Sequence, residues 1–127
     1  MIGAVIIDDE DVNIKLIERL IKKECATINI LGASSTKAGA VELINKVHPD
    51  LIFMDVSLDA SNTGFDVLEE IEPLDAKVIF VTSHDEFAIK AFDYNTIAYI
   101  VKPVIKKDLV VAVNKAIQEL EDKMYTK

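Results

Sequence analysis

The sequence has a single cysteine, no tryptophan and no long hydrophobic run. One cysteine, Cys25, can form neither an internal disulfide nor a cysteine metal site, so we expect it to pack in the core. No run of apolar residues approaches a membrane span. Met1 to Gly3 lead into a strand-like run without the basic lead or cleavage site of a signal peptide. From these features we expect a soluble cytoplasmic protein.

The chain is also short of basic residues. It has 14 Lys and Arg against 22 Asp and Glu, a formal net charge of -8. Contacts to phosphate backbones need clustered basic residues, so this chain alone is not expected to bind nucleic acid directly. Its length of 127 residues, half of them hydrophobic, predicts one domain over residues 1–127 with its own core.

Short aliphatic runs rich in β-branched residues predict strands, and those over Ile2–Ile7, Leu51–Asp55 and Val78–Val81 are expected to be buried. The five predicted strands are Ile2–Ile7, Ile28–Ala33, Leu51–Asp55, Val78–Val81 and Ile97–Val101. Amphipathic stretches between them predict helices. The five predicted helices are Val12–Glu24, Lys37–Val47, a short helix from Gly64 to Pro73, Glu86–Tyr94 and Lys106–Met124.

Some details of the helices are predicted as well. Pro73 should terminate the third helix, because proline cannot continue it. The fourth helix should be amphipathic, with Phe87, Ile89, Ala91 and Phe92 as its apolar residues. We expect the last residues, 122–127, to fray.

Strands that alternate with helices predict an α/β fold, a doubly wound parallel sheet covered on both faces. We take the strand order 2-1-3-4-5 by analogy with flavodoxin-like (CheY-like) folds, because the sequence alone does not derive it. In that order the direction of winding reverses between strands 1 and 3. A crevice then opens at the carboxyl ends of the strands.

A polar side chain follows four of the predicted strands. Strand 1 ends in Asp8 and Asp9, strand 3 in Asp55, strand 4 in Thr82 and strand 5 in Lys102. Any one of them has an ordinary alternative, a strand that ends in a solvated loop residue. Together they are hard to assign to loop solvation, because parallel strands bring their carboxyl ends to one edge.

Three carboxylates at one edge repel each other by several kcal/mol per pair, roughly 4 at 4 Å with an effective dielectric of 20. Lys102 offsets one of these negative charges, and the excess negative charge that remains suits a divalent cation. Oxygen ligands that leave room for water and a phosphoryl group favour Mg²⁺, with Mn²⁺ as a substitute. Such a site lets Asp55 attack phosphorus, with Thr82 and Lys102 placed to bind the phosphoryl oxygens.

With these residues in place, the chain resembles a two-component response regulator receiver domain over nearly its whole length. The matching stretches are Ile6–Glu10, Asp50–Asp55, Phe80–Thr82 and Tyr99–Pro103. The stretch Val78–Phe92 is similar to receivers that precede LytTR-type DNA-binding domains.

This resemblance implies that Asp55 is phosphorylated by a phosphohistidine of a sensor histidine kinase. It also implies that Asp9 is the principal Mg²⁺ ligand, with Asp8 assisting partly through water and Asp55 itself in the metal site. The backbone carbonyl of Ser57 would complete the protein ligands. The function implied is phosphorelay signalling, with transcription controlled by a LytTR-type output domain outside residues 1–127.

The resemblance further implies that Thr82 and Lys102 hold the phosphoryl oxygens and that Tyr99 is the switch aromatic that turns inward when Thr82 moves. A half-buried strand tyrosine is the alternative for Tyr99. A cis peptide bond is expected between Lys102 and Pro103. The face of the fourth helix, fifth strand and last helix would carry an activation-dependent homodimer. The proposed surface contacts there are Lys90, Asp93, Lys106 and Lys107.

The chain departs from the family pattern near the acceptor. Asp59 stands where the family usually has proline, and the loop to Gly64 is one residue longer than usual, which leaves the geometry of the phosphate face open. His84 occupies a position that tunes acyl phosphate hydrolysis in the family, or it is a solvated loop histidine. His48 precedes Pro49 in a turn and is interpreted as structural.

Two other functions compete with a phospho-accepting switch that is not itself an enzyme. A haloacid dehalogenase-like phosphatase needs a second aspartate two residues after its nucleophile, and position 57 is Ser57. A pseudo-receiver used only as a binding module would lack an acid, the acceptor or the lysine, and all are present. A stand-alone receiver that acts through protein–protein contacts remains an alternative form of the first function.

Overall fold

The computed structural model describes residues 1–125 and contains one five-stranded sheet. Its strand order is β2-β1-β3-β4-β5 with all pairs parallel, as predicted. The strands are β1 (Ile2–Ile7), β2 (Ile28–Ser34), β3 (Leu51–Met54), β4 (Lys77–Thr82) and β5 (Thr96–Val101). The predicted boundaries therefore hold to within one residue at each end.

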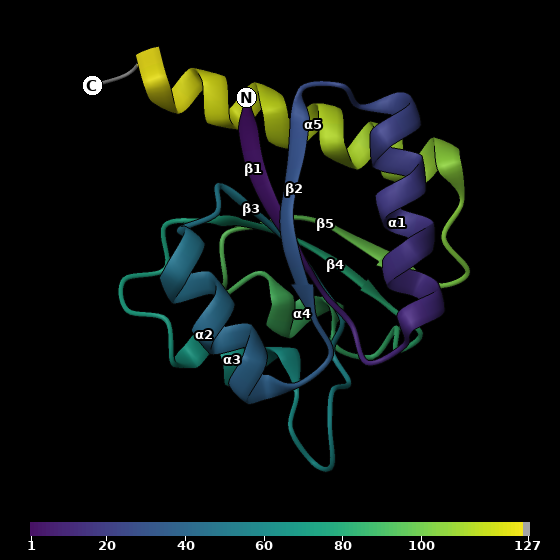
Figure 1. Cartoon of the computed structure of the whole chain (residues 1–127), viewed down its shortest axis with the longest axis vertical. Coiled ribbons are helices and arrows are strands. Elements are labelled where there is room, and N and C mark those ends of the chain that lie inside the picture. The colour runs from purple at the N-terminus through teal and green to yellow at the C-terminus, as the bar shows by residue number, and fades with distance from the viewer. Residues whose placement is uncertain (126–127) are drawn as a thin grey trace.

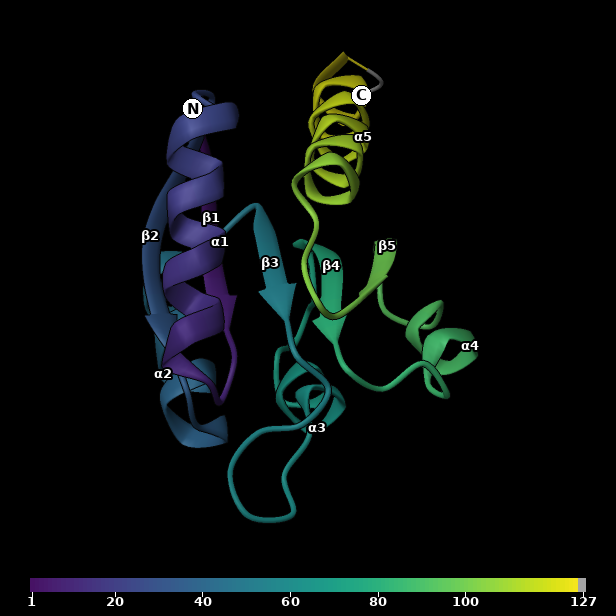
Figure 2. The ribbon, with the colours of Figure 1, turned by 90° about the vertical axis from the view of Figure 1, so that its right-hand side faces the viewer.

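Five helices cover this sheet on its two faces (Figures 1 and 2). They are α1 (Asp11–Glu24), α2 (Lys37–Val47), α3 (Gly64–Glu69), α4 (Ala88–Ala91) and α5 (Lys106–Tyr125). One buried cluster joins α1 and α5 to the sheet, and a second cluster joins α2, α3 and α4 to the other face. The α/β architecture predicted from the alternating pattern is confirmed.

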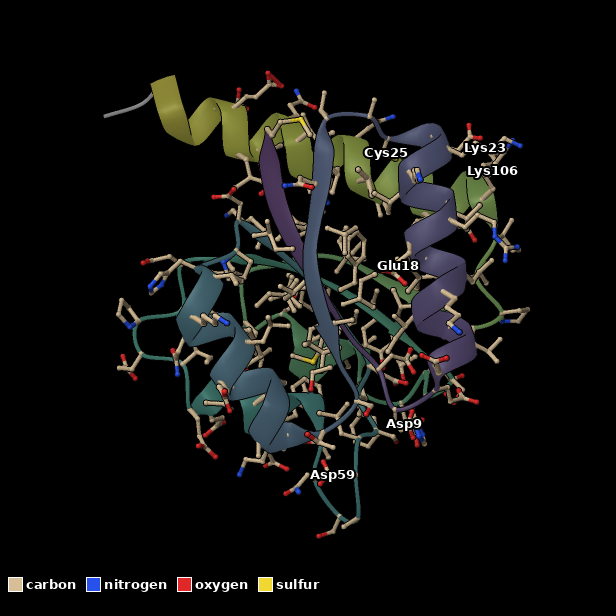
Figure 3. The ribbon with its side chains drawn as sticks, in the orientation of Figure 1. Asp9, Glu18, Lys23, Cys25, Asp59 and Lys106 are labelled. Atoms are coloured by element: carbon tan, nitrogen blue, oxygen red, sulfur yellow. The ribbon has the colours of Figure 1, made fainter. Side chains whose placement is uncertain are left out.

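The three inner strands, β1, β3 and β4, are buried on both faces, because successive side chains point to opposite sides of the sheet. In β1, Ala4 and Ile6 enter the cluster under α1 and α5, while Val5 and Ile7 enter the opposite cluster. Cys25 follows α1 and is buried in the first of these clusters, as predicted (Figure 3).

The prediction for α4 is wrong in both length and orientation. The helix covers only Ala88–Ala91, and two of the four residues expected on its apolar face are exposed, Ile89 by 86% and Phe92 by 75%. This stretch carries two apolar stripes. The stripe that packs inward consists of positions i, i+4 and i+7, which are Phe87, Ala91 and Tyr94. The ring centroid of Phe87 lies 6.1 Å from that of Phe65.

The short helix α3 begins with a capping box. Thr63 Oγ1 accepts from the Asp66 N–H at 3.2 Å, and Asp66 Oδ2 accepts from the Thr63 N–H at 2.8 Å. The helix ends at Glu69, four residues before Pro73, so the prediction that Pro73 terminates it is wrong. The Glu72–Pro73 peptide bond is cis.

The end of α5 differs from the sequence prediction. The backbone is helical through Tyr125, so the expected fraying is wrong for residues 122–125, and the rest of that expectation lies outside the described residues. Within residues 1–125, no helix has the length and apolar character needed to cross a membrane.

Candidate functional site

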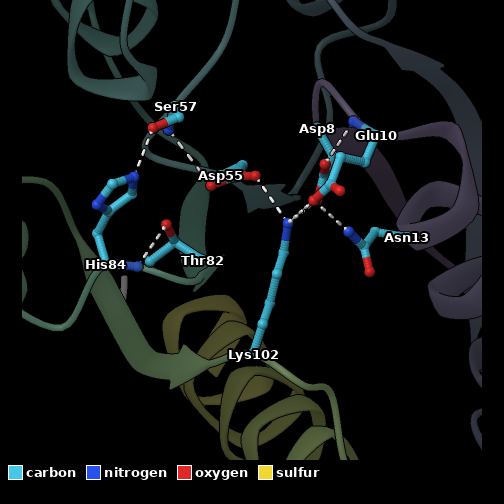
Figure 4. A network of polar contacts seen from close by, with 8 residues as sticks. All are labelled: Asp8, Glu10, Asn13, Asp55, Ser57, Thr82, His84 and Lys102. Carbon is cyan, nitrogen blue, oxygen red and sulfur yellow. Dashed lines mark hydrogen bonds and ion pairs between the residues drawn. The ribbon is translucent and has the colours of Figure 1, made fainter.

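A single lysine joins three acidic side chains at the carboxyl edge of the sheet (Figure 4). Lys102 Nζ lies 2.8 Å from Asp55 Oδ2, 3.0 Å from Asp8 Oδ2 and 3.2 Å from Glu10 Oε1. Lys102 follows β5, Asp55 follows β3 and Asp8 follows β1, so the parallel topology brings these ends together. The predicted grouping of strand ends is confirmed for these three residues, and the Lys102–Pro103 bond is cis as expected.

Asp8 is the most perturbed acid of the site. It is 1% exposed, and burial, with the nearby charge of Asp55, raises its pKa to about 6. Its Oδ1 accepts a 2.8 Å hydrogen bond from the Glu10 N–H, while its Oδ2 makes only the ion pair with Lys102 and accepts no hydrogen bond within the described residues. Burial alone lowers the pKa of Lys102, but the hydrogen bond and charge of Asp55 raise it above its usual value.

Four carboxylates face one another at this edge. One oxygen each from Asp8, Asp9, Glu10 and Asp55 lies within 4.8 Å of the others. Asp9 is exposed overall, but the partial burial of its carboxyl group and the charge of Asp55 raise its pKa. Lys102 is the one cation at hydrogen-bond distance from this cluster among the side chains of residues 1–122, so a formal excess of negative charge remains.

This donor set fits a hard divalent cation. All the available groups are oxygens, as Mg²⁺ and Mn²⁺ prefer. The buried Asp8 Oδ2 lies 3.0 Å from Lys102 Nζ and, as a carboxylate oxygen, has a second lone pair that a metal ion could use. The residues of the structure therefore suit the expected ion.

A second polar network lies beside Asp55, on the side of β4. The Ser57 N–H donates to Asp55 Oδ1 at 3.3 Å, and Ser57 Oγ lies 2.8 Å from His84 Nε2. Thr82 is fully buried at the end of β4, where its Oγ1 accepts from the His84 N–H at 3.3 Å. Thr82 is thus linked to the acceptor region through His84, and no direct hydrogen bond joins it to Asp55 in the part of the chain described.

Tyr99 is half-buried on β5 beneath this network. Its ring lies 5.7 Å from the ring of Phe80, and its hydroxyl donates to the carbonyl oxygen of His84. The ring therefore already lies against the loop between β4 and α4. Whether it moves when Asp55 changes state stays a prediction.

Glu10 and Asn13 belong to the network but were not among the predicted site residues. Glu10 Oε1 accepts from Asn13 Nδ2 at 2.8 Å while it contacts Lys102. In the sequence, Glu10 is explained equally well by the dipole of the helix that follows. Only its place in an acidic run next to Asp9 could have pointed to a role, because the direction of a long flexible side chain is not a local property.

The loop after Asp55 uses the unusual Asp59 in a structural way. Asp59 Oδ1 accepts from the backbone N–H of Lys37 at 2.7 Å, at the first residue of α2 (Figure 3). That bond lowers the pKa of Asp59. Asp59 therefore ties the loop after Asp55 to the start of α2.

Comparison with known proteins gives a consistent result. The profile of the family described as response regulator receiver domain matches residues 4–114. The positive alginate biosynthesis regulatory protein of Pseudomonas aeruginosa is 32% identical over 117 residues, which cover 90% of this chain and 46% of that protein. The sensory transduction protein LytT of Enterococcus faecalis is 29% identical over 119 residues, or 92% of this chain and 48% of that protein. The chain thus spans about half the length of these curated relatives.

Solved structures show the same fold. A response regulator receiver domain protein from Clostridium thermocellum aligns with a TM-score of 0.81 at 26% identity, over 95% of this chain and 98% of that one. The response regulatory domain of mrkE from Klebsiella pneumoniae aligns with a TM-score of 0.85 at 21% identity, over 94% and 98% of the two chains.

Proposed function

This chain belongs to the response regulator receiver domain family, and from that premise we propose that Asp55 accepts a phosphoryl group from a sensor histidine kinase. The observation that carries the proposal is the contact of one lysine with two buried acids from different strands. Lys102 Nζ lies 2.8 Å from Asp55 and 3.0 Å from Asp8. Receiver domains are generally phospho-accepting signalling domains rather than enzymes in the usual sense, and we assign this chain the same role.

Asp8, Asp9, Asp55 and the backbone carbonyl of Ser57 would hold the metal ion. A bound Mg²⁺ would neutralise the carboxylates and polarise the incoming phosphoryl group. Asp9 is the best placed to be a direct ligand, because it is exposed and no hydrogen bond or ion pair ties its carboxylate to another described residue. Asp8 is already engaged by the Glu10 N–H and by Lys102.

In the transfer step, a carboxylate oxygen of Asp55 forms a bond to phosphorus as the bond from phosphorus to the kinase histidine nitrogen breaks. Lys102 then keeps its positive charge beside the transferred oxygens. The buried Thr82 hydroxyl, which now accepts from His84, would turn to donate to one of these oxygens. The nucleophile and the two groups that would hold the phosphoryl oxygens thus all lie at or just after the ends of strands of the same sheet.

We assign residues 1–127 to one receiver domain of a longer cytoplasmic regulator. Its curated relatives are about twice as long and include the LytT protein and transcriptional regulatory proteins. We therefore propose that a LytTR-type DNA-binding domain elsewhere in the full protein controls transcription. This receiver, with its net charge of -8, would not contact the promoter itself.

The face of α4, β5 and α5 would carry the homodimer of the phosphorylated regulator. On α4 it exposes Ile89 by 86% and Phe92, just after the helix, by 75%. Neighbouring exposed apolar residues favour protein contact. Lys90, Asp93, Lys106 and Lys107 flank them and would supply charged contacts.

The test of the acceptor is labelling with magnesium and a small phosphodonor such as acetyl phosphate. Intact-mass analysis should show one added phosphoryl group in the wild type and none in Asp55→Asn, because the amide cannot act as the nucleophile. The matched control is Asp50→Asn, the same change at the other end of β3, which should label like the wild type. Full labelling of Asp55→Asn would disprove the assignment.

A further inference from the structure

His84 is the meeting point of three residues of the proposed switch. Its backbone N–H donates to Thr82 Oγ1 at 3.3 Å, and its carbonyl oxygen accepts from the Tyr99 hydroxyl. Its side chain contacts Ser57 Oγ at 2.8 Å through Nε2 (Figure 4). One residue therefore touches the acceptor loop, the strand end that holds Thr82, and the aromatic ring on β5.

The side-chain contact has its own anchors on both sides. Ser57 lies two residues after Asp55 and donates its N–H to Asp55 Oδ1 at 3.3 Å. On the other side, the His84 ring lies 5.9 Å from the ring of Phe87, and Nδ1 lies 3.5 Å from Glu86 Oε2. The histidine can donate to or accept from the serine hydroxyl according to its tautomer, so the bond persists with either ring nitrogen protonated.

A phosphoryl group on Asp55 would disturb both links of His84 to the site. It brings three strong acceptor oxygens next to the Ser57 N–H and hydroxyl and the Thr82 hydroxyl. When Thr82 turns to the phosphoryl group, the His84 N–H loses its acceptor. When Ser57 shifts toward the phosphoryl oxygens, this bond draws the side chain of His84 with it and so favours the shifted form. Either change reaches the carbonyl that holds Tyr99.

We propose that His84 is a positioning residue, and that its side-chain hydrogen bond to Ser57 carries the state of Asp55 to Tyr99 alongside the route through Thr82. The inference rests on the proposed phosphorylation of Asp55. It assigns a role to Ser57 and His84 side chains that differs from ligation of the metal or contact with the phosphoryl group.

The two routes can be separated because they use different atoms of His84. In His84→Ala the backbone N–H and carbonyl remain, so the contacts with Thr82 and Tyr99 are kept and only the link to Ser57 is lost. Ser57→Ala removes the same link from the other end. His84→Gln and Ser57→Thr retain a polar group that can restore it. Ser61→Ala, an exposed serine in the same loop, is the matched control.

The measurement is the NMR signal of Tyr99 in ¹³C-tyrosine-labelled protein, assigned with Tyr99→Phe and recorded with magnesium and beryllofluoride, a phosphoryl mimic. The wild type, Ser61→Ala, His84→Gln and Ser57→Thr should show the full Tyr99 shift at saturation. His84→Ala and Ser57→Ala should each lower the equilibrium constant for the shifted form about fivefold, the effect expected of one net hydrogen bond. The double variant should show no further loss.

Equal Tyr99 shifts in the wild type, His84→Ala and Ser57→Ala, with beryllofluoride bound in all three, would overturn the inference and leave the acceptor assignment intact. Strictly additive losses in the double variant would also overturn it. Failure of the wild type to bind beryllofluoride would instead refute the proposed phosphorylation site, on which this inference depends.

Discussion

Asp8 makes the stability of the metal-free domain depend on pH. Its pKa is raised from 3.8 to about 6 by burial, so the folded state binds this proton more tightly than the unfolded chain. The folded state therefore loses stability as the pH rises from about 4 to about 6, and ionised Asp8 costs roughly 2–3 kcal/mol above that range. Asp8→Asn keeps an oxygen for the Glu10 N–H and should remove this cost.

Urea unfolding between pH 4 and pH 7 in the absence of metal checks the prediction. We expect the free energy of unfolding of Asp8→Asn to match that of the wild type near pH 4 and to exceed it at pH 7. Added magnesium should raise the stability of the wild type at pH 7. Asp11→Asn, at an acid that is exposed and paired with Lys15 on the surface, is the control and should follow the wild type. Parallel pH profiles for Asp8→Asn and the wild type would show that Asp8 is not the cause.

The adjacent Asp8 and Asp9 should contribute unequally to magnesium binding. Asp9 is exposed and free to contact the ion directly, while Asp8 is buried and shared with Lys102. In calorimetric titrations we expect Asp9→Ala to weaken magnesium binding about a hundredfold and Asp8→Ala about tenfold, as for a residue that acts partly through water. Equal affinities in both variants and the wild type would rule out this metal site.

Among the elements, α3 and the loop before it depend on a close approach at Gly64. A Cβ placed there would lie 2.7 Å from Met54 Cγ and would collide with the backbone oxygen of Asp55. Helix propensity alone predicts that alanine stabilises this position. The collision is with backbone next to the acceptor, so we expect Gly64→Ala to cost about 1–3 kcal/mol and to slow labelling of Asp55.

Denaturant unfolding and acetyl phosphate labelling test this expectation together. Gly32→Ala is the matched control, because a Cβ there would meet the flexible end of Leu43 at 3.0 Å and not backbone. It should change stability less and leave labelling unaffected. Wild-type stability and wild-type labelling in Gly64→Ala would contradict the prediction and would show that the loop tolerates a Cβ without moving Asp55.

For the whole molecule, the exposed α4 surface predicts self-association that depends on activation. Sedimentation with magnesium and beryllofluoride should show a dimer that is about 5- to 150-fold tighter than without them. Phe92→Ser should weaken it, because Phe92 is 75% exposed on this face, and Tyr99→Ala should reduce the response. Val12→Ser, at an equally exposed apolar residue on α1, is the control.

Unchanged self-association with and without beryllofluoride, in the wild type and in Tyr99→Ala, would mean that the output uses another surface. A loss of the dimer in Val12→Ser but not in Phe92→Ser would place the contact on α1 instead.

Local patterns in the sequence were sufficient for the strands and for most of the helices. Aliphatic runs predicted the inner strands, because a strand buried on both faces rarely holds a polar residue in its interior. The polar residue after such a run was therefore informative, and the meeting of Asp55 with Lys102 at one edge was predicted in this way. The strand order, however, was taken by analogy, since crossover rules alone do not choose it.

Only the tertiary structure decided which side chains of a local pattern became buried and which stayed exposed. The stretch around α4 carries two apolar stripes, and packing on Phe65 selected the one that leaves Ile89 and Phe92 exposed. The neighbours Asp8 and Asp9 became one buried and one exposed acid, because β1 ends at Ile7 and the chain bends at Asp9 as it leaves the sheet. The hydrogen bond between Ser57 and His84 joins residues 27 positions apart. Such contacts depend on how two loops meet across the sheet edge, which no local pattern records.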